Sequence, residues 1–508
     1  MSFKSALGRK LQRLGAPPGS TAGSSEPQVP RDGAIGDTPD PVQAVRGEAA
    51  LAPEQPGPQA SHSNALQTGR GRAAFSARLA GPERAPAAGS PRGDGVHGGL
   101  PAGPGVPASF RGEATHGDLP AALGVPEPTA HGLLYVTRRR FGAGHRHGQV
   151  PIETALAACP EHVAALALDP SLASISFDRA LLLDTETTGL AGGAGTLPFL
   201  LGLGWFEPGG SVTLEQLFLR RPGEERPMLA RLSERLASAS CVVSFNGKSY
   251  DWPLLRTRFV MNRMPVPAPP PHLDLLHCAR RAFKYRCESA RLTELEEAVV
   301  GHVRRGDVPG HLIPELYFAY LRGRGHGPLR RVMDHNAQDL LMLAALLGHL
   351  AERFAAPDPT ADPRDALGLA EVAFRARDHA RADAFAAHAA TSPRPDLTSA
   401  ALVIRARVCW RARDIPGAVT WLEQAVKLAV GPFAARLHLA LAKLHEHRIR
   451  DLARAQYHAS RAWGAEAPAR ADRRLQRLKE KLARAEAVTV TPPTSRPPTP
   501  SAPSSPAG

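Results

Sequence analysis

The sequence predicts an α/β domain, in which helices flank a mixed β-sheet, followed by an all-α repeat domain. Residues 131–355 hold three early strand-like segments and then strands that alternate with helices, which is typical of a mixed sheet covered by helices. Residues 365–485 are rich in Ala, helical in pattern and repetitive. The flanking segments, residues 1–130 and 489–508, have the composition of disordered chain.

The long N-terminal leader lacks the residues that build a core. Residues 16–130 are dominated by Pro, Gly, Ala, Ser and Arg, and they contain two Phe but no Tyr, Trp or Cys. Such a segment cannot bury enough apolar area to offset chain entropy, so we expect it to be mostly disordered. The chain has no hydrophobic run of bilayer-spanning length and no secretion signal. Its five scattered cysteines suit reduced thiols, which predicts a cytoplasmic protein without membrane contacts.

The elements of the α/β domain follow one another in a readable order. LLYVTRRRF, from Leu133, has strand character, and PIETALAAC has helix character. ALLLDTET, LPFLLGLGWF and VTLEQLFL read as three strands joined by Gly-rich turns. An amphipathic helix EERPMLARLSERL, a short strand CVVSFN and a helix WPLLRTRFVM come next. The helix LRRVMDHNAQDLLMLAALLGHL ends the domain.

The C-terminal region repeats a helical unit. Units that begin with Arg-Asp start at Arg377, Arg413 and Arg450, which are 36 and 37 residues apart. Each unit holds a pair of Ala seven residues apart, and a small residue precedes the pair by twelve or thirteen positions. The pattern resembles the tetratricopeptide repeat, in which pairs of helices meet at small residues and which commonly recruits protein partners. Most aromatic positions of that consensus are absent here.

Positive charge is concentrated towards the C-terminus. Residues 356–508 hold 24 basic and 15 acidic residues, a surplus of nine in a chain whose net charge is +14. A basic surface there attracts nucleic-acid phosphates in one interpretation. In the other, the Arg-rich composition reflects codon bias alone, and both interpretations stay open at this point.

The motif LLLDTETTGL places Asp184 and Glu186 two residues apart at the end of a buried strand. Residues i and i+2 of a strand share a face, so the two carboxylates converge. Like charges this close raise one pKa unless a cation lies between them, and Mg²⁺ or Mn²⁺ prefers such oxygen ligands. A solvated strand end accounts for the stretch equally well.

Two further acidic residues stand near helix starts. In SFNGKSYDWPLL, Asp251 follows a strand and a turn, where it suits either a helix cap or a metal ligand. The tripeptide GKS is not a phosphate-binding loop, because Val242 occupies the position where that loop needs Gly. In DHNAQDLLMLAA, Asp339 precedes an apolar helical run, and His335 lies on the same helical face.

Taken in order, DTETTG, N-x-x-x-Y-D and a terminal helix that carries x-x-x-D resemble the DEDD (DnaQ-like) superfamily of 3′–5′ exonucleases, which have a ribonuclease-H-like fold. FNGKSYDWPLL and DVPGHLIPELYFAYL resemble the bacterial YprB-like branch of that superfamily. The resemblance covers residues 130–355. It implies that two divalent cations, Mg²⁺ or Mn²⁺, promote in-line phosphodiester hydrolysis, and that they are held by four carboxylates, those of Asp184, Glu186, Asp251 and Asp339.

The resemblance leaves the residue that orients the attacking water open. One group of the superfamily has His five residues before the last Asp, and another has Tyr four residues before it. Here position 334 is Asp, and His335 stands at the spacing normally taken by Tyr. We expect His335 to orient or deprotonate the water, with Asn336 as a rival that orients water without taking its proton.

Residues around the predicted site are candidates for contact with the nucleic acid. Asn246 suits either a nucleotide contact or the turn, Lys248 suits a phosphate, and Tyr250 suits base stacking. His145 and His147 are metal-ligand types, but without a third ligand in sequence they more often mark a polar turn.

The sequence as a whole predicts a metal-dependent nuclease, a 3′–5′ exonuclease acting on a single-stranded 3′ end of DNA or RNA. The alternative is a non-catalytic nucleic-acid-binding module whose repeat domain recruits a protein partner.

Overall fold

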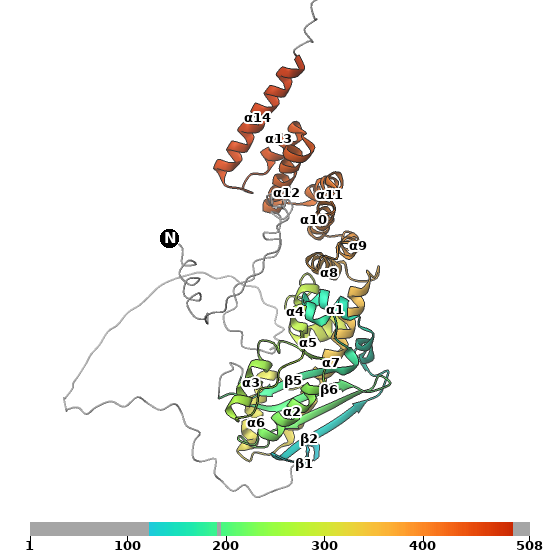
Figure 1. Cartoon of the computed structure of the whole chain (residues 1–508), viewed down its shortest axis with the longest axis vertical. Helices are drawn as coiled ribbons and strands as arrows, with labels where there is room; N and C mark the ends of the chain where they lie inside the picture. Colours follow the sequence, from blue (N-terminus) through green and yellow to red (C-terminus); the bar gives the residue numbers. More distant parts are fainter. Residues whose placement is uncertain (1–120, 190–194, 491–508) are drawn as a thin grey trace, which may run out of the picture. The chain divides into compact units, whose positions relative to one another are not determined.

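The α/β domain contains a seven-stranded sheet in the order β1-β2-β7-β6-β5-β8-β9 (Figure 1). The computed structural model describes residues 121–189 and 195–490. Strand β5 pairs antiparallel with β6 and parallel with β8, and β8 pairs parallel with β9. The predicted mixed sheet is therefore confirmed. The strands are β1 (Val125–Thr129), β2 (Gly132–Phe141), β5 (Ala180–Thr187), β6 (Pro198–Phe206), β7 (Val212–Phe218), β8 (Cys241–Ser244) and β9 (His272–Asp274), with a separate small pair, β3 (Arg146–His147) and β4 (Val150–Pro151).

Helices cover both faces of this sheet, because its strands are apolar on both sides. Leu182 packs into a core with α1 (Pro160–Ala167), α4 (Leu275–Ala282) and the C-terminal part of α7 (Gly327–Ala355). Leu181 and Leu183 point into a second core, on the face covered by α2 (Arg226–Ser238), α3 (Asp251–Met261) and α6 (Ile313–Leu321). A short helix, α5 (Leu292–Leu295), runs into a π-helical turn, η8 (Glu296–Val300). Helix α7 contributes to both cores and packs against β5.

The ordered chain begins before Leu133, where the sequence pattern placed its start. Strand β1 lies within the segment predicted as leader and reads VPEPT. Two prolines argue against a strand in general, because proline cannot donate a backbone hydrogen bond. Here β1 is an edge strand that pairs only with β2. Pro126 and Pro128 are two residues apart on it, so their backbone nitrogens both point to the unpaired edge. Both prolines therefore occupy positions where their missing N–H groups cost the sheet nothing.

The segment PIETALAAC forms a 3₁₀ helix, η5 (Ile152–Ala157), rather than a regular α-helix. Three further short 3₁₀ helices, η4 (Ala121–Leu123), η6 (Pro170–Leu172) and η7 (Phe177–Arg179), lie before β5, and η9 (Gly310–Leu312) precedes α6. No helix in the described part of the chain is long and apolar enough to cross a membrane.

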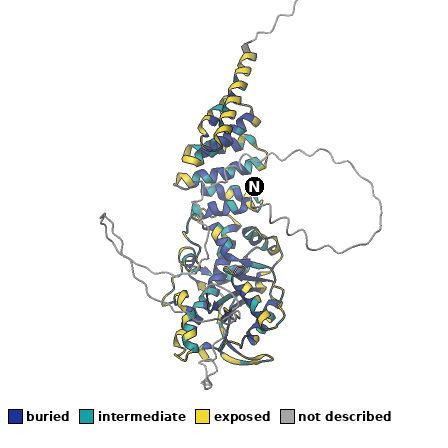
Figure 2. Ribbon diagram, turned by 90° about the vertical axis from the view of Figure 1, so that its left-hand side faces the viewer, coloured by how far each residue is buried: buried dark blue, intermediate teal, exposed yellow. Residues whose placement is uncertain are grey.

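The C-terminal region consists of paired helices. The pairs are α8 (Pro363–Arg375) with α9 (His379–Ala389), α10 (Pro395–Arg411) with α11 (Ile415–Leu428), and α12 (Gly431–Leu444) with α13 (Leu452–Arg461), followed by α14 (Pro468–Val490). Figure 2 shows buried residues along the interior of these pairs. Small residues fill the contacts as the repeat pattern predicts, since the aligned alanines are at most 4% exposed: Ala370, Ala382, Ala389, Ala406, Ala418, Ala425, Ala442, Ala455 and Ala462.

The Arg-Asp dipeptide of each repeat forms the turn between paired helices. Arg377, Arg413 and Arg450 have φ values of 66°, 61° and 65°, in the left-handed region. The following Asp accepts a backbone hydrogen bond from the first turn of the next helix in each case, at Asp378, Asp414 and Asp451. The dipeptide that marks the repeat in the sequence is thus a helix stop followed by a helix start.

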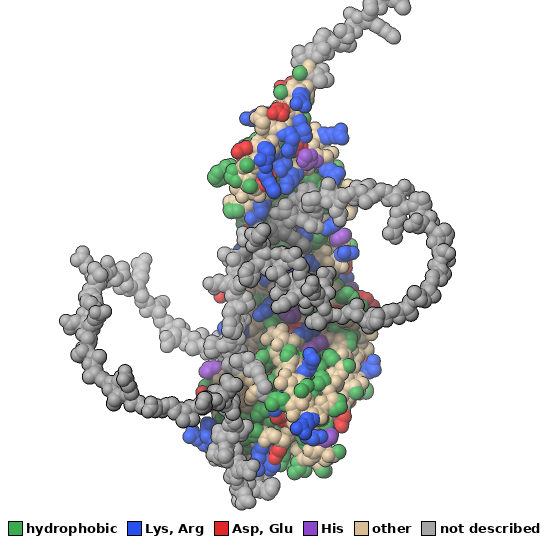
Figure 3. Space-filling model, turned by 60° about the vertical axis from the view of Figure 1, so that its left-hand side comes forward, with side chains coloured by type: hydrophobic (Ala, Val, Ile, Leu, Met, Phe, Trp, Pro, Cys, Tyr) green, Lys and Arg blue, Asp and Glu red, His purple; other side chains and the backbone are tan. Residues whose placement is uncertain are grey.

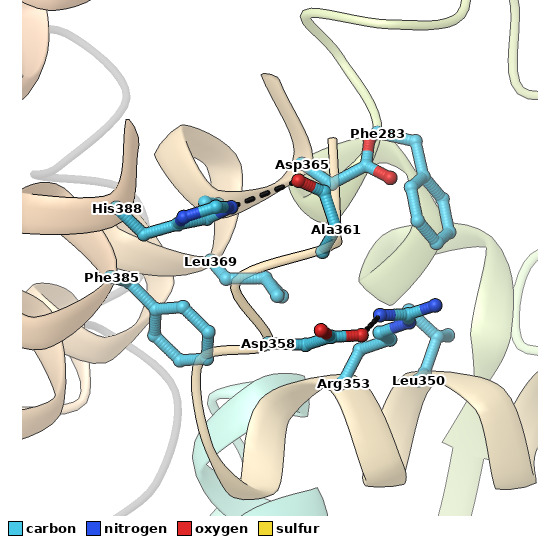
Figure 4. A pocket seen from close by; sticks show the side chains of 10 residues that line it. Phe283, Leu350, Arg353, Asp358, Ala361, Asp365, Leu369, Phe385 and His388 are labelled. Carbon is cyan, nitrogen blue, oxygen red and sulfur yellow. Dashed lines mark hydrogen bonds and ion pairs between the residues drawn. The ribbon is translucent and has the colours of Figure 1, made fainter. Parts of the chain in front are cut away.

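The first helix pair shares a core with the α/β domain. Helix α8 packs against α4, and Gly368 approaches the backbone of Ala282 so closely that a Cβ atom would lie 2.2 Å from its carbonyl oxygen. Arg286 and Asp365 form an ion pair of 2.6 Å across this junction. A cavity of about 10 Å³ lies beside the ion pair, between Phe283, Leu369 and Phe385 (Figure 4). It has room for no more than a single water, so the junction is a packed contact.

Candidate active site

Strand β5 presents Asp184 and Glu186 to the face of the sheet that α7 covers. Leu182 points into the core on that face, and side chains at every second position of a strand follow it. A β-bulge between Glu186 and Thr187 ends the regular pairing with β6. The predicted pair of carboxylates therefore lies where the regular pairing of β5 with β6 ends, and Glu186 is only 9% exposed.

Asn336 of α7 holds Asp184 from the opposite side. Its amide nitrogen donates to Asp184 Oδ2 at 2.7 Å, and its amide oxygen accepts from Gln216 Nε2 at 2.9 Å. Asn336 is fully buried. The sequence offered it as a rival for orienting water, but both ends of its amide are engaged within the protein. Asn336 is a positioning residue for Asp184.

The close approach of α7 to the sheet depends on Gly202. This residue of β6 is the register partner of Asp184. A Cβ atom at position 202 would lie 2.2 Å from Asn336 Oδ1. Glycine is required here to give the Asn336 side chain room, not for backbone conformation.

Asp251 joins the site as the first residue of α3. The residue before it, Tyr250, is the N-cap, and no side chain caps this helix, so the capping interpretation of Asp251 is wrong. The hydroxyl of Thr185, on β5, donates to Asp251 Oδ1. This contact ties the start of α3 to the end of β5, close enough that the charge of Asp251 contributes to the raised pKa values of Asp184 and Glu186.

Asp339 and His335 reach the site from successive turns of α7. His335 Nδ1 lies 2.7 Å from Asp307 Oδ1, while its Nε2 lies 3.4 Å from Asp339 Oδ2 and 4.0 Å from Glu186 Oε1. The Arg304 guanidinium binds Asp339 Oδ1 through Nη2 and lies 3.3 Å from Asp307 through Nη1. Ligand atoms of Glu186, His335 and Asp339 all lie within 4.8 Å of one another.

The gathered carboxylates repel one another in a buried place. Burial, followed by the charges of Asp339, Glu186 and Asp251, raises the pKa of Asp184 well above its ordinary value. Burial raises the pKa of Glu186 to about 8 and that of Asp251 to about 6. Burial by itself lowers the pKa of His335, but its acidic neighbours, Asp339 first, raise it to about 10. The pocket therefore holds more negative charge than Arg304 and His335 neutralise.

We expect the metal-free protein to lose stability as the pH rises from 7 to 8.5. The folded pKa of Glu186, about 8, lies above its unfolded value, so the folded state holds a proton that the unfolded chain has released. The raised pKa of His335 acts in the same direction. Urea titrations in EDTA should show the free energy of unfolding falling by about 1–2 kcal/mol, at up to about 1.4 kcal/mol per pH unit and proton. Stability that rises over this interval contradicts the charge arrangement.

The three residues predicted to contact nucleic acid lie in the turn between β8 and α3. Asn246 has a φ of 65° and an exposed side chain, and its backbone N–H donates to Asp274 Oδ1 at 2.8 Å. The exposed Lys248 lies 3.3 Å from Asp169. The Tyr250 hydroxyl bonds to the Gly189 carbonyl and lies 3.0 Å from the Thr187 hydroxyl, so this ring braces the chain after β5. Asp274 holds this turn, because its carboxylate accepts the backbone N–H groups of both Asn246 and Lys248.

Sequence reasoning missed Arg304 and Asp307. Both lie in the loop between η8 and η9, far in sequence from the four carboxylates. Asp307 opens the segment DVPGHLIPELYFAYL, which carries the resemblance to the YprB-like branch, so a signal for its importance was present. Nothing in the sequence indicates that this loop folds over α7.

His147 is not part of an exposed polar turn. It is 2% exposed, its Nε2 lies 2.5 Å from Glu296 Oε1, and its ring stacks on His302 with centroids 4.2 Å apart. Glu296 Oε2 accepts from Arg304 Nε at 2.6 Å. The His147–Glu296 pair thus supports the guanidinium that contacts Asp339.

The donor set of the site fits divalent cations of the Mg²⁺ or Mn²⁺ class. Asp184, Glu186, Asp251 and Asp339 offer carboxylate oxygens, the ligands that hard cations prefer. Burial first, and then like charges at Asp184 and Glu186, raise the pKa values of these carboxyl groups, and bound divalent cations would favour their ionised forms.

Comparison with known proteins bears on the fold of the α/β domain. Residues 181–351 match the family model of the RNase_H superfamily. The uncharacterized protein YprB of Bacillus subtilis (strain 168) is 38% identical over 172 residues, which make up 34% of this chain and 41% of that protein. The chain therefore spans about two fifths of that relative's length. The α/β domain has an RNase H-like fold, which indicates a nuclease-like domain.

Proposed function

We propose that this protein is a metal-dependent nuclease of the DEDD type, which removes nucleotides from the 3′ end of single-stranded DNA or RNA. The convergence of Asp184, Glu186, Asp251 and Asp339, from three distant segments, carries this proposal. A match to an RNase H-like superfamily model supports the reaction class, and the DEDD assignment rests on the order of the motifs. The segment from Ser244 to Asp251 supports it further, because it positions a carboxylate and an exposed cationic turn together.

Asp184, Glu186, Asp251 and Asp339 would hold two divalent cations. Strand β5, helix α3 and helix α7 contribute these carboxylates from different sides of the pocket. When bound, such ions activate water and stabilise the departing oxyanion of the phosphodiester. Asn336 keeps Asp184 in position, and Thr185 does the same for Asp251. The ligand oxygens are thereby oriented before substrate arrives.

His335 and Asp307 form the pair that handles the attacking water. Asp307 fixes the imidazole through Nδ1, so that Nε2 faces Glu186 and Asp339. A water held between those carboxylates would lie within reach of Nε2. Because acidic neighbours raise the pKa of His335 to about 10 without metal, this imidazole would orient the water, and would receive its proton only once bound cations lower that pKa. Arg304 forms ion pairs with both Asp339 and Asp307. Through Asp307 it thereby fixes the position of His335 relative to Asp339.

Contacts to the nucleic-acid backbone come from cationic residues outside the pocket. Lys248 lies in the exposed turn before α3, beside Asp251. Figure 3 shows Lys and Arg side chains gathered over the last helices, and the exposed ones include Arg461, Arg470, Arg473, Arg477, Lys479 and Arg484. These residues supply a sequence-independent attraction for phosphates. The tetratricopeptide-like helix pairs beyond the shared core would bind a protein partner.

The test is a degradation assay on single strands labelled at the 5′ end. With Mg²⁺ or Mn²⁺, the protein should shorten linear DNA or RNA stepwise from the 3′ end and leave a circular single strand intact, and EDTA should stop the reaction. Duplex DNA and RNA complete the substrate panel. Cleavage of the circle would replace the exonuclease by an endonuclease. Tight binding without shortening, under either metal, would favour the non-catalytic binding module.

A further inference from the structure

A second cluster of ligand-type side chains lies in the helix pairs, outside the nuclease pocket. Glu423 comes from α11, His438 from α12, His445 from the π-helical turn η10 (His445–Ile449) and His458 from α13. These helices are neighbours in the structure (Figure 1). Ligand atoms of Glu423, His445 and His458 all lie within 4.8 Å of one another. His438 Nδ1 lies 2.9 Å from His458 Nδ1.

His445 is buried without a hydrogen-bond partner among the described residues. It is 1% exposed, and neither of its ring nitrogens makes a hydrogen bond. Its nearest acidic atom is Glu423 Oε1, 3.6 Å from Nε2. Buried polar groups are almost always paired, because leaving one unpaired costs about 1–3 kcal/mol. The unpaired ring nitrogens of His445, next to Glu423 and His458, therefore indicate that these side chains bind an ion.

The contact between His438 and His458 points the same way. Two Nδ1 atoms at 2.9 Å cannot both carry a proton, so at least one of them directs a lone pair at the other. Two nitrogens bound to one ion at about 2.0–2.1 Å lie roughly 3 Å apart, close to this spacing. The rings of His445 and His458 stack in parallel, with centroids 5.5 Å apart, so the two imidazoles lie side by side in this cluster.

The protonation states suit ligation. Burial, and then the neighbouring His438 and His445, lowers the pKa of His458 to about 4. Burial lowers the pKa values of His438 and His445 as well. Metal ligation requires neutral imidazole, and these histidines are neutral at physiological pH. Arg454 lies 3.2 Å from Glu423.

We propose that His445, His458 and Glu423, with His438 beside His458, form a binding site for one transition-metal ion of the Zn²⁺ class. Two imidazoles and a carboxylate, with a third imidazole next to one of them, are a ligand set that favours Zn²⁺ over Mg²⁺, which prefers oxygen. The apolar core between α12, α13 and α14 is small and consists of Ala442, Ala455, Ala459 and Leu478. The ion would fasten α13 to α11 and α12, beside this small core.

The experiment uses the full chain, stripped of metal with a chelator and then titrated with Co²⁺ in excess Mg²⁺. Mg²⁺ occupies the carboxylate pocket of the nuclease site, so that site does not contribute. We expect one Co²⁺ per chain with the visible absorption of a four-coordinate site, displacement of Co²⁺ by Zn²⁺, and a higher melting temperature with Zn²⁺. His445→Gln and His458→Gln should lose the band.

A matched control lies on the same π-helical turn. The side chain of His447 is 53% exposed, so His447→Gln should retain the band and the Zn²⁺ affinity. His438→Gln changes a half-buried position that tolerates substitution, and it should weaken Zn²⁺ binding at least about 10-fold while the fold is kept. Unchanged Co²⁺ absorption in His438→Gln and His445→Gln, or a parent protein whose melting temperature ignores Zn²⁺, overturns the site. Neither result bears on the nuclease, whose assay is separate.

Discussion

The Asp184→Asn/Glu186→Gln protein should lose nuclease turnover by about 10³-fold or more and, at the same time, become more stable without metal. Each carboxylate removed takes away part of a charge stabilisation worth several kcal/mol, and about 1.4 kcal/mol corresponds to tenfold in rate. The same substitutions relieve repulsion, since burial and like charges raise the pKa values of both groups in the folded protein. In EDTA at pH 8.5, the variant should melt several degrees above the parent.

The two measurements together separate a catalytic site from a merely structural acidic cluster. If the carboxylates were internal ion-pair partners, their neutralisation would lower the melting temperature. The added stability should disappear when excess Mn²⁺ is present, because the ion stabilises only the parent. Asp472→Asn, at an exposed position of α14, is the matched control and should change neither rate nor stability. Full activity in the double variant would rule out the proposed site.

Gly202→Ala should destabilise the domain and disable the nuclease, although position 202 carries no side chain. The added Cβ atom would lie 2.2 Å from Asn336 Oδ1, so α7 must move away from β6. Overpacking of this kind costs about 1–3 kcal/mol. Because Asn336 also orients Asp184, the displacement carries a ligand out of position. Urea denaturation and the degradation assay both report the effect.

The double variant Gly202→Ala/Asn336→Ala isolates the two consequences. Removal of the Asn336 amide abolishes the clash, so most of the lost stability should return. Turnover should stay low, because nothing then holds Asp184. Gly142→Ala is the control, since a Cβ atom there meets nothing within 4 Å. Equal stability of Gly202→Ala and the parent would contradict the close packing of α7 on the sheet.

Local patterns were sufficient for most of the elements and for part of the candidate site. Asp184 and Glu186 share a face because strand residues alternate, and their identity as a pair follows from spacing alone. His335 and Asp339 share a face of α7 for the corresponding helical reason. The Arg-Asp dipeptides were visible as repeat markers, and they proved to be the turns and caps that any helix pair needs.

Other features depended on context that no local pattern carries. Strand β1 escaped prediction because its prolines are tolerated only at a sheet edge. His147 looked like a turn residue, since Glu296 is distant in sequence and reaches it only through the fold. Asn336 suited catalysis as a residue type, but its complete burial made it a support for Asp184.

The sequence by itself determined which residues bear charge at strand ends and helix starts, and in what order they occur. Only the tertiary structure decided that Arg304 contacts Asp339 and that Asp307 contacts His335. It also decided that histidines of different helices lie together around His445. Periodicity encodes the direction of a side chain relative to its own element. The distance between elements depends on how their faces pack, and packing at Gly202 or Ala442 is a property of both partners together.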